Sequence, residues 1–519
     1  MKLVVVHYHL RPGGVRRVIE LALPALVRAL RPAVSEVVLA VGEAGDTRWL
    51  AALQATLAPR PVTLCVQPEL AYWTETSQSA AVTRRLRVFF DTLLGETGTE
   101  TLVWAHNPGL GRNLPATAAL VRACVRHRRS LVLHHHDWWF DNRWHRWAEL
   151  RAAGGSTLSR VAATILPGAA NVRHVAINGA DAACLRRHFP QQGGWLPNPS
   201  SPARRPVPKR VRTALDWLRV TLGDEAPVWL LPCRLLRRKN VAEALLLTRW
   251  LRPEAWLVTT AAVSSPDEQS YAERLAADAQ RHGWRLRLSV LQGEHRERPT
   301  VAELMAASEA LILTSLVEGF GLPYLEAATA RRPLLARALP NIAPDLKQFG
   351  FRFPYAYDEV LIAPSLFDWP AEHARQQEQF WRWRSRLPSA CRHWAQPPAW
   401  LAQQDVTAPV SFSRLTLTAQ LEVLAQPSAG SWKQCAPLNP FLEKCRSAAA
   451  AGRLQPMSWP RSAEKWLSGP AYARQFNAIL RDRPKCEPGR GASLAAQEDF
   501  MRSKLTAENQ YPLLWGDDS

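Results

Sequence analysis

Two pairs of charged residues in the second half of the chain have types and spacing suited to binding a phosphate and a sugar together. Arg234 and Lys239 are separated by four residues, and Glu318 and Glu326 by seven. Two cations on one turn can bind a diphosphate. Two carboxylates beside a phosphate are electrostatically unfavourable unless they accept hydrogen bonds from sugar hydroxyls. The pattern therefore predicts a ligand that carries both a phosphate and a sugar.

The segment between the two glutamates has the features of an anion-binding turn. Gly319, Phe320 and Gly321 follow the first glutamate, and Pro323 comes two residues later. Glycines leave backbone N–H groups accessible, and proline is favoured in the first turn of a helix, whose N-terminus attracts anions. Only nine of the 65 basic residues are lysines, so Lys239 suggests a position that needs a compact ammonium group. The alternative for this lysine is a solvated basic loop.

Histidines gather at the ends of three predicted strands in the first 200 residues. Six of the 14 histidines follow the strands expected at 3–6, 101–105 and 131–133, namely His7, His9, His106, His134, His135 and His136. Ligands of open parallel sheets bind beyond the carboxyl ends of the strands. We therefore expect a binding crevice in which His136 or an immediate neighbour contacts substrate. The alternative is a set of histidines that hydrogen-bond to backbone at a crowded sheet edge.

A metal site is another interpretation of the same histidines. His134 and His136 share one face if the strand continues, and Asp137 follows them. A catalytic zinc usually has three well-separated ligands in a fixed geometry, which consecutive residues provide poorly. We therefore assign no metal ligand.

A glycine pair lies between the first predicted strand and the helix that follows it. Gly13 and Gly14 permit a close backbone approach, and the helix N-terminus offers unpaired N–H groups to an anion. The alternative is a simple turn. The dinucleotide fingerprint G-x-G-x-x-G is absent here, which argues against an NAD-dependent enzyme.

These residues must be positioned by strands and helices that alternate along two stretches of the chain. Such alternation predicts two doubly wound α/β domains, and prolines at 202, 206 and 208 indicate a linker between them. The predicted domains are residues 1–203 and 204–370. Residues 371–426 read as a helical, Trp-rich segment, and residues 427–519 as a C-terminal extension without an assigned structure.

Composition and charge narrow the class of protein. The 519 residues are 47% hydrophobic and 21% charged, which is typical of globular proteins. The net charge of +20 is dispersed, so a basic nucleic-acid-binding protein ranks behind an enzyme with an acidic small substrate. No long uncharged apolar stretch and no paired cysteine motif occur, so we expect a cytoplasmic protein without a transmembrane segment. A peripheral contact with a membrane stays open.

The ordered set of Arg234, Lys239, Glu318 and Glu326, with Gly-Phe-Gly after the third and a Gly-Gly loop near the N-terminus, resembles glycosyltransferase family 4. The resemblance covers roughly residues 1–370. It implies a GT-B fold, in which two Rossmann-like domains face each other across a crevice. It also implies a retaining transfer of a sugar from a nucleotide diphosphate sugar to an acceptor. The nucleotide base, the sugar, the acceptor and the oligomeric state stay open.

The resemblance also implies roles for individual residues. Arg234 and Lys239 bind the donor diphosphate and stabilise the leaving group, while Glu326 accepts hydrogen bonds from the ribose. Glu318 and the backbone amides of residues 319–321 hold the donor sugar, and His136 lies by the transferred sugar. Gly13 and Gly14 are counted with the donor-binding residues.

The closest alternative activity is that of a glycan phosphorylase of related fold, which would use inorganic phosphate and would have no ribose to bind. No two aspartates are separated by a single residue, so the Asp-x-Asp that holds a divalent ion in the other large glycosyltransferase fold is missing. We therefore expect neither metal nor cofactor.

Overall fold

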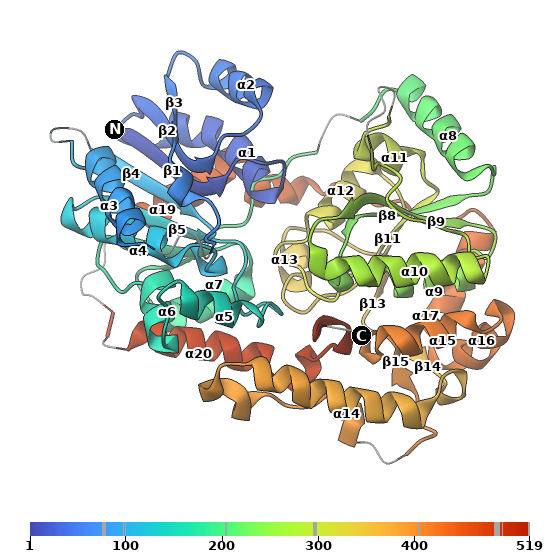
Figure 1. The fold of residues 1–519 in the computed structure, drawn as a ribbon. Coiled ribbons are helices and arrows are strands. Elements are labelled where there is room, and N and C mark those ends of the chain that lie inside the picture. Colours follow the sequence, from blue (N-terminus) through green and yellow to red (C-terminus); the bar gives the residue numbers. More distant parts are fainter. Residues whose placement is uncertain are drawn as a thin grey trace. The chain divides into compact units, whose positions relative to one another are not determined.

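The chain folds into two compact units, each built on its own β-sheet (Figure 1). The computed structural model describes residues 1–74, 79–96, 98, 100–202, 205–293, 298–402, 405–481, 488–489 and 491–516. The first unit comprises Met1–Ser201, Arg386–Trp394 and Arg461–Lys504, and the second comprises Pro202–Ser385, Ala395–Pro460 and Leu505–Ser519. Residues 203 and 204, where the sequence predicts the domain boundary, lie outside the described residues.

The first unit contains a seven-stranded sheet in which every paired strand is parallel to its neighbour. The strand order is β3-β2-β1-β4-β5-β6-β7. The strands are β1 (Lys2–His9), β2 (Glu36–Glu43), β3 (Val62–Val66), β4 (Thr101–His106), β5 (Ser130–His135), β6 (Val172–Ala176) and β7 (Gly193–Trp195). This order is that of a Rossmann-like, doubly wound sheet.

Both faces of the first sheet are covered by helices, as the apolar runs of its strands require. The helices of this unit are α1 (Gly14–Ala29), α2 (Thr47–Leu57), α3 (Ala80–Leu94), α4 (Leu114–Arg126), α5 (Arg146–Ala152), α6 (Leu158–Ile165), α7 (Gly179–His188), α18 (Glu464–Leu467), α19 (Gly469–Arg481) and α20 (Ala492–Lys504). Along β1, Leu3 and Val5 pack in the core with α1, α2 and α19, whereas Val4 packs in the core with α3 and α4. Because successive side chains point to opposite faces of the sheet, β1 contributes to two separate hydrophobic cores.

The second unit repeats the architecture with a six-stranded parallel sheet. Its strand order is β10-β9-β8-β11-β12-β13. The strands are β8 (Val228–Leu235), β9 (Trp256–Val263), β10 (Leu286–Arg287), β11 (Ala310–Leu313), β12 (Leu334–Arg337) and β13 (Tyr355–Tyr357). A short antiparallel pair, β14 (Leu361–Ile362) with β15 (Val410–Ser411), lies outside this sheet.

One helix of the second unit is buried on every side. The helices here are α8 (Pro208–Leu222), α9 (Val241–Leu251), α10 (Gln269–Arg281), α11 (Val301–Ala307), α12 (Leu322–Ala330), α13 (Ala343–Gln348), α14 (Trp369–Arg386), α15 (Leu417–Ala425), α16 (Ser428–Cys435) and α17 (Pro440–Ala450). Helix α9 packs against β8 and β9 and also against α15, α16 and α17. Trp250 of α9 donates a hydrogen bond to Ser431 of α16 at 3.0 Å. The chain beyond residue 400 thus completes the second unit's core.

The last third of the chain contributes to both units. In the first unit, Tyr472 and Phe476 of α19 belong to the core under α1, and Asn477 donates to the carbonyl of Ala29 at 3.2 Å. Helix α20 packs on α6 and α7, where Gln497 donates to the carbonyl of Leu158 at 3.0 Å. Residues 427–519, which the sequence analysis treats as one C-terminal extension, are therefore divided between the units.

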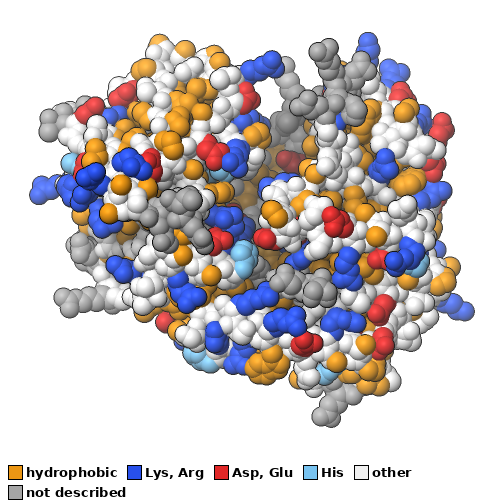
Figure 2. Space-filling view, in the orientation of Figure 1, with side chains coloured by type: hydrophobic (Ala, Val, Ile, Leu, Met, Phe, Trp, Pro, Cys, Tyr) orange, Lys and Arg blue, Asp and Glu red, His pale blue; other side chains and the backbone are white. Residues whose placement is uncertain are grey.

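Two surface properties bear on partners. On the face that Figure 2 shows, Lys and Arg side chains are dispersed over both units, and Asp and Glu side chains are scattered among these basic side chains. Within the described residues, none of the helices combines the length and the apolar character needed to span a lipid bilayer.

Candidate functional site

Each sheet has a point where the strand order reverses direction, and the candidate residues cluster there. In the second sheet β8 lies between β9 and β11, so the loops after β8 and β11 leave the sheet side by side in opposite directions. In the first sheet the strand order reverses between β1 and β4. Ligands of open α/β sheets bind at the carboxyl ends of the strands at this position.

In the second unit, the loops after β8 and β11 meet through a buried ion pair. Lys239 ends a single helical turn after β8, and its ammonium group contacts the carboxylate of Glu318, which follows β11. Each of the two side chains is only 9% exposed. Thr314 at the end of β11 donates a hydrogen bond to the carbonyl of Lys239 at 2.8 Å, which fixes the two loops to each other. The fold thus brings together two residues to which the sequence analysis gives separate roles, Lys239 at the diphosphate and Glu318 at the sugar.

Two more groups bind the same carboxylate. Arg238 donates to Glu318 Oε2 at 3.0 Å, and Ser315 donates to Oε1 at 2.7 Å. Burial alone would raise the pKa of Glu318, but the charge of Lys239 and then that of Arg238 outweigh it and lower the pKa to about 2. Glu318 is therefore ionised at neutral pH and lies between two cations.

The glycine-containing turn after Glu318 has a defined backbone. Gly321 caps helix α12 with a φ of 81°, and a Cβ there would lie 2.7 Å from Ile342. Phe320 is buried and packs against Phe349. Gly319 is partly exposed, and Glu326 lies on the exposed side of α12. The turn therefore needs its second glycine for conformation, and its first glycine is accessible.

Arg234 differs in its exposure from the buried residues around Glu318. It is exposed near the end of β8, at a register shift in the pairing with β9. Arg238, which the sequence analysis did not select, is the arginine that joins Lys239 at Glu318. The sequence shows three consecutive basic residues, Arg237, Arg238 and Lys239. Only the geometry of the turn decides which of their side chains face the carboxylate.

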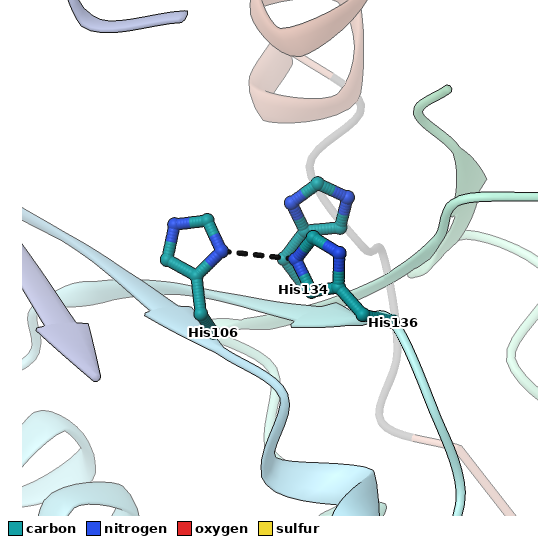
Figure 3. A group of neighbouring side chains, drawn as sticks. All are labelled: His106, His134 and His136. Atoms are coloured by element: carbon teal, nitrogen blue, oxygen red, sulfur yellow. Dashed lines mark hydrogen bonds between the residues drawn. The ribbon is translucent and has the colours of Figure 1, made fainter. Parts of the chain in front are cut away.

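In the first unit, His106, His134 and His136 lie together at the ends of β4 and β5 (Figure 3). His106 Nδ1 and His136 Nε2 are hydrogen-bonded at 3.0 Å, and the ring of His134 lies 4.3 Å from that of His136. His7, at the end of β1, has its ring 6.1 Å from that of His106. All four side chains are buried.

Burial keeps these histidines neutral. It lowers the pKa of His7 to about 3 and that of His136 to about 4, with Asp137 partly opposing the shift at His136. The pKa values of His106 and His134 lie well below the usual value, because both are buried beside other imidazoles. Neutral imidazoles can donate or accept a proton or a hydrogen bond, and they can also bind a metal.

Three of these four histidines could together hold a metal ion. His106, His134 and His136 each place a ring nitrogen within 4.8 Å of the other two. His134 Nε2 lies 3.3 Å from the carbonyl oxygen of Leu196, and in the described part of the chain its Nδ1 has no hydrogen-bond partner. Such an outer carbonyl is a common partner of metal-bound histidines. The hydrogen bond between His106 and His136 offers a metal-free explanation of their approach.

An asparagine to which the sequence analysis assigns no role shapes the loop that carries His136. Asn107 adopts a left-handed conformation with a φ of 60° directly after β4. Its side-chain oxygen accepts hydrogen bonds from the backbone N–H groups of His136 at 3.3 Å and Asp137 at 3.0 Å. The signal was present, since asparagine tolerates this backbone conformation and bonds to nearby backbone.

Gly13 and Gly14 begin helix α1 in the first unit and are both exposed. Their φ angles need no glycine, and a Cβ on Gly14 would meet nothing within 4 Å. Neither packing nor conformation within the described structure accounts for the pair, so room for a ligand stays the prediction for them.

Comparisons with known proteins give one curated relative and many solved structures. The chain is 24% identical over 400 residues to mannosylglucosyl-3-phosphoglycerate synthase of Petrotoga mobilis, covering 74% of this chain and 73% of that protein. No protein-family model matches the chain.

Solved structures with detectable similarity include HepE of Anabaena in complex with UDP-glucose, with 16% identity, a TM-score of 0.46, and coverage of 87% of this chain and 100% of that one. Sucrose-phosphate synthase of Thermosynechococcus elongatus has 15% identity, a TM-score of 0.48, and coverage of 92% and 98%. Because these TM-scores are below 0.5, we assign the two Rossmann-like domains from the strand orders given above.

Proposed function

We propose that the protein is a glycosyltransferase that transfers a sugar from a nucleotide diphosphate sugar to an acceptor. The observation that carries the proposal is the meeting of Lys239 and Glu318 at the switch point of the second sheet. A cation for the diphosphate and a carboxylate for sugar hydroxyls are held together where α/β sheets bind ligands. The name of the Petrotoga relative, a synthase of mannosylglucosyl-3-phosphoglycerate, supports transfer of a glycosyl group.

The cations are proposed to act on the leaving group. When the acceptor oxygen bonds to the anomeric carbon, the bond from that carbon to the diphosphate oxygen breaks, and the acceptor's proton passes to the released diphosphate or to solvent. Negative charge then grows on the diphosphate, and a preorganised ammonium group stabilises it. Lys239 has three N–H donors, so it can contact Glu318 and a phosphate oxygen together. Arg234, before the same turn, and Arg238, within it, add positive charge.

The carboxylates and glycines are proposed to orient the donor. Glu326 accepts hydrogen bonds from the ribose hydroxyls, and Glu318 with the amides of residues 319–321 binds the transferred sugar. In the first unit, His136 acts on the transferred sugar as a neutral hydrogen-bonding group, and Gly13 and Gly14 leave space for the donor. Membership of family 4, retention at the anomeric carbon and independence from a metal are parts of this proposal.

The test is a panel of UDP-, GDP- and ADP-sugars, first by thermal shift and then by product formation. A ligand at 100 times its dissociation constant stabilises a protein by about 2.7 kcal/mol, which gives a clear shift. Acceptors would include 3-phosphoglycerate and glucosyl-3-phosphoglycerate. Binding of one nucleotide sugar by wild type, and weaker binding by Glu326→Ala, is expected. Cleavage of a glycan by inorganic phosphate to give a sugar phosphate, without any nucleotide, would instead indicate a phosphorylase.

A further inference from the structure

Three arginines of the first unit meet beyond the carboxyl ends of β4 and β5. Arg112 lies between β4 and α4, while Arg143 and Arg146 lie in the loop after β5 and at the start of α5. Arg146 and Arg143 are also joined by a backbone hydrogen bond of 3.0 Å. Strands β4 and β5 are neighbours in the sheet, so these loops leave the same edge together. This edge is where a parallel sheet presents its ligand-binding loops.

The most buried of the three guanidinium groups is incompletely hydrogen-bonded within the part of the chain that the structure describes. Arg146 is only 9% exposed, and among the described residues its Nε and one terminal nitrogen have no hydrogen-bond partner. The Nε of Arg112 is in the same situation. A buried charged donor without an acceptor is costly, and native proteins keep few of them without a functional reason.

The neighbouring carboxylates compensate this charge incompletely. Glu149 lies 3.6 Å from Arg112 and 3.9 Å from Arg146, beyond hydrogen-bond distance, and its side chain is half exposed. Asp137 lies 3.4 Å from Arg143 and is 40% exposed. Burial, followed by the charges of Arg112 and Arg143, lowers the pKa of Arg146 to about 9. Three cations therefore face two partly solvated anions.

Aromatic side chains flank the cluster. The guanidinium carbon of Arg112 lies 4.6 Å from the centre of the Tyr72 ring. A guanidinium stacked on a ring directs its N–H groups outward in its own plane, where a planar or tetrahedral anion can accept two of them. Tyr8, at the end of β1, faces the same arginines and is buried.

We propose that Arg112, Arg143 and Arg146 bind a phosphate or carboxylate group of the acceptor. The inference rests on the proposed function, since it names the acceptor class of the same enzyme. The donor diphosphate already has its cations in the second unit, so a second anion site in the first unit serves the other substrate. Because the deepest guanidinium is buried, it suits a small soluble anion that enters the site better than the flat surface of a membrane.

The experiment measures binding of 3-phosphoglycerate and of inorganic phosphate to the full-length protein by calorimetry, without donor. Wild type is expected to bind 3-phosphoglycerate. Arg146→Gln and Arg112→Gln are each expected to weaken binding by about 10- to 100-fold, the range for losing a charged hydrogen bond. Arg151→Gln is the matched control, because Arg151 is an exposed arginine of α5 that lies over Trp147.

The melting temperature of each variant separates this role from a structural one. If Arg146 serves a ligand, its replacement by glutamine removes a buried, poorly compensated charge and leaves the melting temperature without ligand unchanged or higher. Should Arg146→Gln fail to fold, Arg146→Lys decides, since it keeps the charge but loses the planar fork and is also expected to weaken binding.

Several results would overturn the inference. They are no binding by wild type, equal binding by all variants, or binding only to phosphatidylglycerol vesicles and not to 3-phosphoglycerate. Nucleotide-sugar binding is measured in parallel and is expected to be unchanged in Arg146→Gln. If the nucleotide sugar binds and 3-phosphoglycerate does not, only this inference fails. If 3-phosphoglycerate binds through these arginines and no nucleotide sugar does, the proposed function fails instead.

Discussion

Lys239 and Glu318, 79 residues apart in sequence, form a buried ion pair across the loops that follow β8 and β11. The pair joins the two neighbouring strands at which the second sheet reverses its order. A buried pair costs desolvation energy, and its retention is easier to understand at a site where a ligand uses the charges. The proposed donor is such a ligand.

Replacing Lys239 is expected to slow the chemical step more than it weakens donor binding. The ammonium stabilises charge that grows on the diphosphate only as the bond breaks. Lys239→Ala should therefore lower turnover by on the order of 10²- to 10³-fold in steady-state kinetics. Lys347→Ala, at an exposed lysine of α13, is the control. Wild-type turnover in Lys239→Ala would contradict the assignment.

Acid is expected to destabilise the protein through Glu318. Its pKa is about 2 in the folded protein, against an ordinary value of 4.5, because the charges of Lys239 and Arg238 outweigh the effect of burial. A depressed carboxyl pKa contributes stability that is complete above about pH 4.5 and is lost as the pH falls toward 2. Urea unfolding at several pH values should show a steeper acid loss in wild type than in Glu318→Gln. Parallel curves would show that the pair does not titrate as described.

The sheets were predictable from the sequence because parallel strands buried on both faces form continuous apolar runs. The run at 3–6 lies within β1, and the run at 101–105 lies within β4. Strands β7 and β13 have three residues each, too few for periodicity to detect. Strand ends then located the histidines, since ligand-binding residues of such sheets concentrate there.

The side chains that act together could not be predicted in the same way. His106 and His136 meet because β4 and β5 are neighbours, which depends on strand order. Arg146 is indistinguishable in sequence from the many solvated arginines of this chain, and only its burial sets it apart. Arg238 differs from Arg237 by the turn that orients it toward Glu318. Tertiary packing therefore supplies the part of the site that local patterns omit.

Removing Glu326 is expected to weaken donor binding with less effect on turnover. Its proposed hydrogen bonds to the ribose are made about equally in the ground state and the transition state, so they lower the Michaelis constant without changing kcat. Glu326→Ala should raise the donor's Michaelis constant about 10-fold. Glu273→Ala on α10 provides an exposed control. Unchanged donor affinity in calorimetry would rule out the ribose contact.

Replacing His136 is expected to reduce transfer while nucleotide affinity stays near that of wild type. Burial lowers its pKa to about 4, so the imidazole is neutral throughout the range from pH 6 to 8. His136→Ala should lower kcat, and the wild-type pH profile should show no step near pH 6.5 from this residue. His393→Asn, at an exposed histidine of the first unit, is the control. A protonation step near pH 6.5 that disappears in His136→Ala would contradict the neutral role.

Transfer is expected to persist in excess EDTA. The proposed leaving-group cations are side chains, so no divalent ion is needed against the diphosphate. The buried histidines His106, His134 and His136 are where a metal would contradict this expectation, because their ring nitrogens lie close enough together to hold an ion. Metal content of the purified protein and turnover with and without EDTA should be measured together. His134→Gln is the diagnostic variant, because His134 Nδ1 has no hydrogen-bond partner in the described structure and would be a natural ligand. Stoichiometric zinc that is lost in His134→Gln, together with activity that EDTA abolishes and zinc restores, would replace the metal-free proposal with a metal-dependent one.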